Sequence, residues 1–235
     1  MAEPQIIIGG DLGQHNADLS ASAERIRRGK AYRDLSTVIV IPTRGSIPAR
    51  VVENWMGLMM PMNQKVIRLF VSGMEVGEAY SAAVQLILDH PELSKWRYML
   101  TLEEDNLPPA DGLLRLYEHI DDYAALGGLY WTKGEGGQPM IYGDPKAILA
   151  FAPQVPQPER VQECNGLGMG FTLFRLDVFR DPRIPRPWFK TVQEVGSQGT
   201  QDLYYFGNVR KAGYRVASDN RVKVGHLDPG TGIVW

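Results

Sequence analysis

The sequence predicts an α/β domain with a mostly parallel central sheet flanked by helices. Three apolar runs have the composition of strands that are buried on both faces, at residues 37–41 (TVIVI), 65–72 and 97–102. Residues 49–60, 78–90 and 111–123 place apolar side chains at helical spacing between and after these runs. Strands that alternate with helices form parallel sheets, whose ligands bind beyond the carboxyl ends of the strands.

The first 36 residues differ in composition from the alternating strands and helices that follow them. Residues 1–36 contain a short apolar run and a basic run at 24–33, and we expect them to form an N-terminal extension before a fold that starts at Ser36. The basic run is typical of a solvated helix face, and contact with an acidic acceptor is the alternative.

The second half of the chain contains further predicted elements. Residues 171–179 read as a strand, residues 202–212 as a helix that ends at Gly213, and residues 221–226 as a last strand.

Composition excludes several classes of protein. The 235 residues include 25 basic and 27 acidic ones, so a formal charge of -2 gives no overall attraction for nucleic acid or an anionic membrane. The single cysteine, Cys164, cannot form an intramolecular disulfide, and the N-terminus lacks a secretory pattern. No apolar run approaches the roughly 18 residues of a membrane span. We therefore expect a cytoplasmic protein without a membrane span.

Three adjacent acids follow the third apolar run. Glu103, Glu104 and Asp105 lead into a turn that Pro108 and Pro109 stiffen. Adjacent carboxylates repel one another, and a folded chain tolerates them at the surface or around a cation. A solvated turn is the structural alternative to a functional site.

Three segments resemble one known family. They are VIVIPTRG at 38–45, LTLEEDNLPP at 100–109 and TQDLYYFGNVRKAGYRVASDNRVKVGH at 200–226. In this order and at these separations they resemble the GT-A glycosyltransferases, particularly family 2 and its compact soluble bacterial or bacteriophage members. The resemblance implies a single catalytic domain over residues 37–235, with a nucleotide-sugar-binding half at 37–125 and an acceptor-binding and catalytic half at 126–235.

The same resemblance implies roles for the acidic loop and for the last strand. Asp105 would bind a metal ion, Mn²⁺ or Mg²⁺, and His226 would join it at the end of the last strand. Glu103 and Glu104 would contact the donor ribose or support the metal through water. An ordinary surface histidine is the alternative for His226. Carboxylate, imidazole and diphosphate oxygens suit these cations, and the set lacks the thiolates of a structural zinc site.

Further residues would bind the donor and activate the acceptor. By resemblance Pro42, Thr43, Arg44 and Gly45 line the nucleotide of a UDP- or GDP-sugar, although a tight turn explains the proline and the glycine equally well. Asp202 would be the general base of an inverting reaction, and a helix-start acid is its alternative. Gln201 stands where the family usually has glutamate. The family's helix arginine near residues 78–81 is also absent.

Aromatic residues beside polar ones suit a sugar ring. Trp131, Gly168 and Trp188 are the candidates for an acceptor or sugar pocket, with core packing as the alternative for the two indoles. The G-x-G-x-G at 166–170 precedes a strand and not a helix, so it does not predict a dinucleotide site.

The predicted function is metal-dependent transfer of a sugar from a nucleoside diphosphate to a hydroxyl. The alternatives are a non-catalytic nucleotide-sugar or glycan-binding module and a sugar-phosphate nucleotidyltransferase, whose Gly-rich signature after the first strand is missing. The acceptor stays open among a glycan, a small molecule, a protein and, in a phage setting, a hydroxymethylated DNA base.

Overall fold

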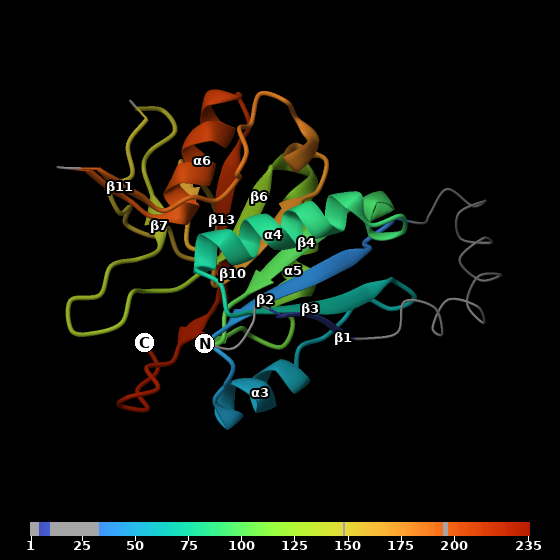
Figure 1. Ribbon diagram of the computed structural model, residues 1–235. Coiled ribbons are helices and arrows are strands. Elements are labelled where there is room, and N and C mark those ends of the chain that lie inside the picture. Colours follow the sequence, from blue (N-terminus) through green and yellow to red (C-terminus); the bar gives the residue numbers. More distant parts are fainter. Residues whose placement is uncertain (1–4, 10–32, 148, 195–196) are drawn as a thin grey trace.

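A central sheet of eight strands organises the part of the chain that the computed structural model describes, residues 5–9, 33–147, 149–194 and 197–235. Helices cover both faces of this sheet (Figure 1). In spatial order the strands are β1 (Gln5–Gly9), β3 (Val66–Ser72), β2 (Thr37–Thr43), β4 (Tyr98–Leu102), β10 (Phe171–Arg175), β6 (Ala125–Leu129), β13 (Val216–Lys223) and β8 (Val161–Cys164).

Five of the eight strands run in the same direction, in agreement with the predicted mostly parallel sheet. Strands β3, β2 and β4 pair in parallel, and so do β6 and β13. β10 runs antiparallel between β4 and β6, while β1 and β8 are antiparallel strands at the two edges. Residues 38–41 of β2 are fully buried, because helices cover both faces of a strand that reads as a continuous β-branched run. The predicted fold class is therefore confirmed.

The N-terminal region contributes to the sheet. β1 pairs with β3 from Gln5 opposite Ser72 to Gly9 opposite Arg68, so the sheet includes residues that we had assigned to an extension before Ser36. Of the basic run at 24–33, residues 24–32 lie outside the described residues. Arg33 donates to the Tyr117 carbonyl at 2.6 Å and pairs with Asp121 at 3.0 Å.

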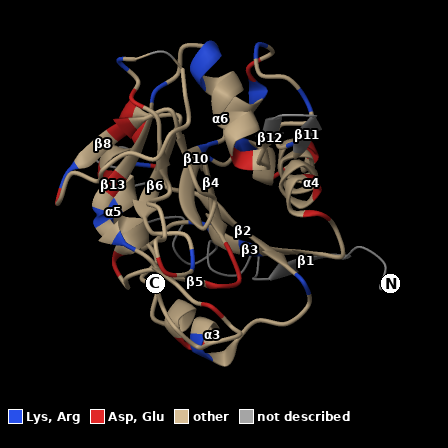
Figure 2. Ribbon diagram, turned by 90° about the vertical axis from the view of Figure 1, so that its left-hand side faces the viewer, with Lys and Arg blue, Asp and Glu red and all other residues tan. Residues whose placement is uncertain are grey.

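The helices fall into two layers. α4 (Val76–Asp89) and α6 (Gln201–Lys211) cover one face, whereas α3 (Ala49–Met56) and α5 (Gly112–His119) cover the other (Figure 2). All four coincide with predicted helices to within a few residues. α3 is four residues shorter than predicted, because the chain leaves the helix at Gly57, whose N–H caps the last turn.

Three short strand pairs lie outside the main sheet. They are β5 (Asn106–Leu107) with β14 (Gly225–His226), β7 (Ile141–Tyr142) with β9 (Gly166–Leu167), and β11 (Val192–Glu194) with β12 (Ser197–Gly199). The first pair matters for the site, because it sets His226 opposite Asn106, directly after the acidic loop. Single-turn 3-10 helices complete the elements at Leu93–Lys95, Ile120–Asp122 and Val178–Arg180.

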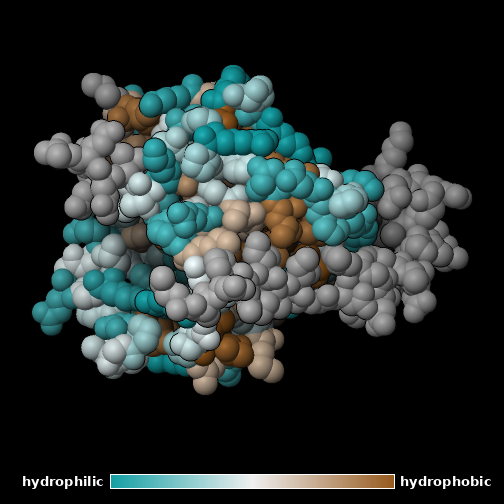
Figure 3. All heavy atoms as spheres, in the orientation of Figure 1, coloured by the Kyte–Doolittle hydropathy of each residue, from teal (hydrophilic) through white to brown (hydrophobic). Residues whose placement is uncertain are grey.

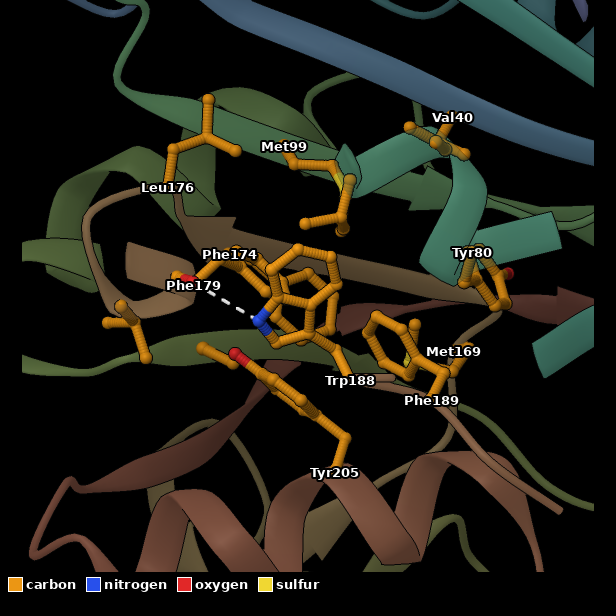
Figure 4. Packing of buried hydrophobic residues seen from close by; sticks show 14 of the residues in the cluster. Val40, Tyr80, Met99, Met169, Phe174, Leu176, Phe179, Trp188, Phe189 and Tyr205 are labelled. Carbon is orange, nitrogen blue, oxygen red and sulfur yellow. Dashed lines mark hydrogen bonds between the residues drawn. The ribbon is translucent and has the colours of Figure 1, made fainter. Parts of the chain in front are cut away.

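Aromatic side chains fill the core between the sheet, α4 and α6 (Figure 4). The Phe174 ring on β10 stacks on Phe206, with 5.9 Å between ring centroids, and meets Tyr205 at 5.7 Å. Trp188 belongs to this cluster: its side chain is buried, and its indole N–H donates to the Phe179 carbonyl at 3.1 Å. Core packing therefore describes Trp188.

Exposed apolar side chains gather at the end of α3. Met56 and Met62 are 83% and 86% exposed. Figure 3 shows apolar residues at the lower edge of the molecule, the side on which Figure 1 places α3. No helix in the described ranges combines the length and the apolarity that a bilayer crossing requires.

Removing the Phe174 ring tests the packing of this core. Phe174→Ala should lower the free energy of unfolding by about 3–5 kcal/mol, because the ring is fully buried and the space it leaves is lined by other rings. Urea denaturation measures the change. Val155→Ala is the matched control, since Val155 is 87% exposed, and it should leave the denaturation midpoint unchanged. A midpoint for Phe174→Ala equal to that of the control would contradict the described packing.

Candidate functional site

The acidic loop lies at the carboxyl ends of β2 and β4. Residues 103–105 connect β4 to β5 (Figure 2). The Glu103 N–H donates to the Gly170 carbonyl at 3.1 Å, and the Asn106 N–H donates to the Glu103 carbonyl at 3.0 Å. The backbone of the loop is therefore fixed by its own turn and by the segment that precedes β10.

Glu104 ties the loop to the end of β2. One carboxylate oxygen accepts from the Thr43 hydroxyl at 2.7 Å and from the Arg44 N–H at 3.0 Å, and the other accepts from Arg44 Nε. The hydrogen bond and the charge of Glu104 raise the pKa of Arg44. Because both oxygens have partners in the protein, Glu104 orients Arg44 and the β2 loop.

Asp105 lies between two basic side chains. Lys133 Nζ is 2.5 Å from its Oδ2, and His226 Nε2 is 3.6 Å from the same oxygen. Partial burial raises the pKa of this carboxyl, but the hydrogen bonds and charges of His226 and Lys133 outweigh burial, and the pKa is lowered overall. The sequence prediction that Asp105 and His226 share one site agrees with this geometry.

The neighbours of His226 determine which nitrogen faces Asp105. Nδ1 lies 2.8 Å from the Trp131 carbonyl, which can only accept, so Nδ1 carries the proton that is donated there. In the neutral ring Nε2 then has a lone pair on the side of Asp105. This lone pair and the carboxylate oxygen of Asp105 are both acceptors, so they repel each other. A proton or a cation between the two atoms would remove this repulsion.

Two side chains at this position fit a divalent cation. An unprotonated imidazole nitrogen and a carboxylate are both ligands of Mn²⁺ and Mg²⁺. No group of three His, Cys, Asp or Glu side chains with the geometry of a metal site occurs among the described residues. Asp105 and His226 would therefore need oxygens from a bound substrate or water to complete the coordination.

Glu103 differs from its neighbours. It accepts a hydrogen bond from the Tyr80 hydroxyl of α4 at 3.0 Å. Burial, and then the charges of Asp105 and Asp202, raise the pKa of Glu103 to about 7. The three adjacent acids thus do not carry three full charges, which is how the fold tolerates them.

Asp202 lies in the first turn of α6 and is 6% exposed. Burial raises the pKa of its carboxyl, while hydrogen bonds from Thr200 and from the Leu203 N–H at 2.9 Å act in the opposite direction. The start of α6 packs closely against the start of α4, where a Cβ added to Gly77 would lie 3.0 Å from the Gln201 Cβ. Asp202 is thereby held near enough to Glu103 for its charge to raise the pKa of the Glu103 carboxyl.

A pocket of about 540 Å³ opens beside the acidic loop. Of the predicted donor-site residues, Pro42, Thr43, Arg44, Glu103, Glu104 and Asp105 line it. Sequence reasoning missed the apolar side of the pocket, which consists of Val71, Gly73, Met74 and Val76. Val71 lies near the end of β3, Gly73 and Met74 follow that strand, and Val76 begins α4. The rule that ligands bind beyond parallel strand ends could have found them, because β3 is the next parallel strand.

A second pocket, of about 680 Å³, adjoins the first. Arg44 and Glu104 line both pockets. The second pocket is completed by Ser46, Ile47, Pro48, Lys133, Asp228 and Pro229. Lys133 is a site residue that the sequence analysis did not identify.

The remaining predicted site residues differ in how far they are buried in the protein. Gly45 has a φ of +107°, a backbone conformation that favours glycine, and its N–H donates to the Thr43 hydroxyl at 3.1 Å. Trp131 is partly buried and reaches the site through its carbonyl. Gly168 is buried against Tyr130, whose hydroxyl would lie 2.0 Å from an added Cβ, so only glycine fits there. Trp188 lies in the aromatic core, as described above.

Comparison with known proteins supports the fold. No protein-family model matches the chain, and no curated protein has a significantly similar sequence. Among solved structures, the crystal structure of A197 from STIV is similar with a TM-score of 0.59 and 20% identity, over 82% of this chain and 86% of that one. S. aureus TarS 1-349 gives a TM-score of 0.43 and 12% identity, over 78% of this chain and 58% of that one.

The chain therefore shares its fold with A197, a GT-A-like arrangement of a mostly parallel sheet between helices. This confirms, at the level of the fold, the resemblance that the three sequence segments predicted. At 20% identity the similarity shows the fold alone, and the chemistry has to be argued from the site.

Asp202→Asn tests the burial of this carboxyl. A group whose pKa is raised by folding stabilises the protein most below its unfolded pKa, about 4 for Asp, and less as the pH rises through the folded pKa. The melting temperature of Asp202→Asn should therefore rise relative to wild type between about pH 4 and pH 8. A change of about 1 kcal/mol moves the melting temperature by roughly 2–4 °C at this chain length, which calorimetry resolves.

The exposed Asp122 provides the matched control. Asp122→Asn should follow the wild-type melting temperature at every pH. If the difference in melting temperature between Asp202→Asn and wild type were the same at every pH, the Asp202 carboxyl would be hydrated and not buried.

Proposed function

We propose that this protein is a glycosyltransferase that moves a sugar from a nucleoside diphosphate sugar to an acceptor hydroxyl. One observation carries the proposal: the acidic loop at 103–105 lines a pocket of about 540 Å³ at the carboxyl ends of parallel strands in a GT-A-like fold. A pocket of this size fits a ligand of several hundred daltons. A UDP-sugar or a GDP-sugar is the donor that we propose.

The two sides of the pocket suit the two parts of such a donor. Val71, Met74 and Val76 offer an apolar surface for the face of a nucleoside base. Arg44 and the acidic loop lie on the polar side, where hydroxyl and phosphate oxygens need partners. We assign the ribose to the side of Glu103, since Glu104 already binds Thr43 and Arg44.

A divalent cation, Mn²⁺ or Mg²⁺, is part of the proposal. Asp105 and His226 would hold it, and the diphosphate oxygens would complete its coordination. When bound, such a cation neutralises the charge that develops on the departing diphosphate.

We propose Asp202 as the general base. The acceptor oxygen forms a bond to the anomeric carbon while the bond from that carbon to the phosphate oxygen breaks, and the hydroxyl proton passes to the Asp202 carboxylate. Attack on the face opposite the leaving group inverts the configuration. The raised pKa of Asp202 makes its carboxylate a stronger proton acceptor than an exposed one.

The acceptor would bind near Trp131 and Gly168. Trp131 is partly buried above the site, and its ring could pack on the C–H face of a sugar. A glycan, a small molecule, a protein and, in a phage, a hydroxymethylated DNA base are the acceptor classes to screen. We propose the cytoplasm as the location, where the free, buried thiol of Cys164 would stay reduced.

Nucleotide-sugar turnover tests the proposal. UDP-, GDP- and TDP-sugars are incubated with the protein, Mn²⁺ and members of these acceptor classes, and release of nucleoside diphosphate is measured beside calorimetric binding. Asp202→Asn should lower turnover by about 10²–10⁴-fold and leave donor binding nearly intact, because it removes only the proton acceptor. Asp105→Ala should instead weaken binding of the donor in Mn²⁺.

Asp122→Asn, which changes an exposed acid, is the control and should behave as wild type. Wild-type turnover by Asp202→Asn would refute the base assignment. Binding without turnover by the wild-type protein would favour a non-catalytic nucleotide-sugar-binding module, with which Gln201 in place of glutamate is consistent. Release of pyrophosphate from a nucleoside triphosphate would favour a nucleotidyltransferase.

A further inference from the structure

We propose that Lys133 is a built-in cation of the diphosphate site, an alternative to a divalent metal ion on the Asp105 carboxylate, and that it allows the protein to bind a diphosphate without metal. The inference rests on the proposed function, because the diphosphate is that of the donor. It assigns a role in donor binding to a lysine of the second half that the sequence analysis did not identify.

The first observation is the pairing of charges in the free protein. Arg44 pairs with Glu104, and Lys133 pairs with Asp105 at 2.5 Å. Glu103 has the Tyr80 hydroxyl as its partner. The acidic loop is thus already balanced by two cationic side chains of the protein, and no metal ion is needed to hold it together.

The second observation is how firmly the segment that carries Lys133 is held. Trp131, two residues earlier, accepts from His226 through its carbonyl and forms a β-bridge with Pro139. The Thr132 N–H donates to the Gln138 carbonyl at 2.9 Å, which closes the turn around Gly134 and Gly136. The glycines are confined to the tip of this hairpin. The hydrogen-bonded pairs at its open end, Trp131 with Pro139 and Thr132 with Gln138, therefore hold the backbone of Lys133 next to the site.

The third observation is the position of the ammonium group. The Lys133 side chain is 28% exposed and Asp105 is 14% exposed, so this pair is better shielded from water than an ordinary surface pair. Lys133 lines the second pocket together with Arg44, whose side chain is 79% exposed. A diphosphate in this pocket would therefore meet an ammonium and a guanidinium, the two groups that bind phosphate oxygens best.

Lys133 and a divalent cation would compete for one oxygen. Asp105 Oδ2 is 2.5 Å from Lys133 Nζ and 3.6 Å from His226 Nε2. A cation that used this oxygen would lie against the ammonium group, and like charges at such a distance repel strongly. The flexible four-carbon stem of lysine permits the ammonium to leave Asp105 for a phosphate oxygen.

Binding of diphosphates in EDTA tests the inference. Calorimetry measures the affinities of UDP, GDP and inorganic pyrophosphate for wild type, Lys133→Gln and Lys133→Arg. Wild type should bind UDP or GDP in EDTA, and also pyrophosphate. Lys133→Gln should bind them about tenfold or more weakly, the effect of one lost charge-assisted hydrogen bond, and Lys133→Arg should keep most of the affinity. Lys146→Gln, which removes an exposed lysine, should equal wild type.

Manganese binding to the nucleotide-free protein provides a second readout. Lys133→Gln should bind Mn²⁺ about tenfold or more tightly than wild type, because the competing ammonium is gone. Electron paramagnetic resonance of free Mn²⁺ measures this affinity without any turnover. A melting temperature near that of wild type would confirm that the variant is folded.

The possible failures are distinguishable. Equal diphosphate affinities of wild type and Lys133→Gln in EDTA, or wild-type binding that EDTA abolishes, would overturn the role of Lys133 and leave the proposed glycosyl transfer standing. Lys133-dependent binding of pyrophosphate together with no turnover of any nucleotide sugar would support the cation site and refute the proposed function.

Discussion

The hydrogen bonds between Glu104 and the end of β2 are the constraint on which the site depends. Parallel pairing of β2 with β4 brings their carboxyl ends to the same edge of the sheet. Glu104 then joins the two ends by accepting from the hydroxyl of Thr43 and from the backbone and side chain of Arg44. Its neighbours Glu103 and Asp105 are fixed on either side of that connection. One carboxylate therefore has a structural role, and the ligand contacts that we propose for the loop fall to the other two.

The three acids have different electrostatic states because their neighbours differ. Burial and the charges of Asp105 and Asp202 raise the pKa of Glu103 to about 7, whereas the basic partners His226 and Lys133 lower the pKa of Asp105. The chain turns at Glu104 and Asp105, and each acid meets a different element of the fold: Glu103 meets α4, Glu104 the end of β2, and Asp105 the residues after β6. This separation explains how three consecutive carboxylates can lie in a folded protein without mutual repulsion opening the loop.

Local patterns in the sequence predicted the strands β2, β3, β4 and β10 and the four helices, but not the strands β1, β6 and β8. The proximity of Asp105 and His226 was expected from the resemblance to GT-A glycosyltransferases, and not from local patterns. A β-branched run such as TVIVI determines a buried strand by itself, and parallel strands fix where their ends meet. Lys133 could not be predicted, because its approach to Asp105 depends on a hairpin that the Trp131 carbonyl anchors to His226. Every residue has a backbone carbonyl, so no residue type in the sequence marks this contact. Trp188 was assigned to a sugar pocket from its residue type, but its burial depends on Phe179 and Tyr205, which lie elsewhere in the chain.

The position of β10 explains why neither half of the chain can form the site alone. β10 is antiparallel, so the residues before it, including Gly170, lie at the carboxyl end of β4, where Gly170 accepts from the Glu103 N–H. On the far side of β10, β6 runs parallel to β4 and continues into the hairpin of Lys133. The acids thus come from the first half, whereas Lys133, His226 and Asp202 come from the second. The sheet between them must be complete before these side chains can lie beside one another.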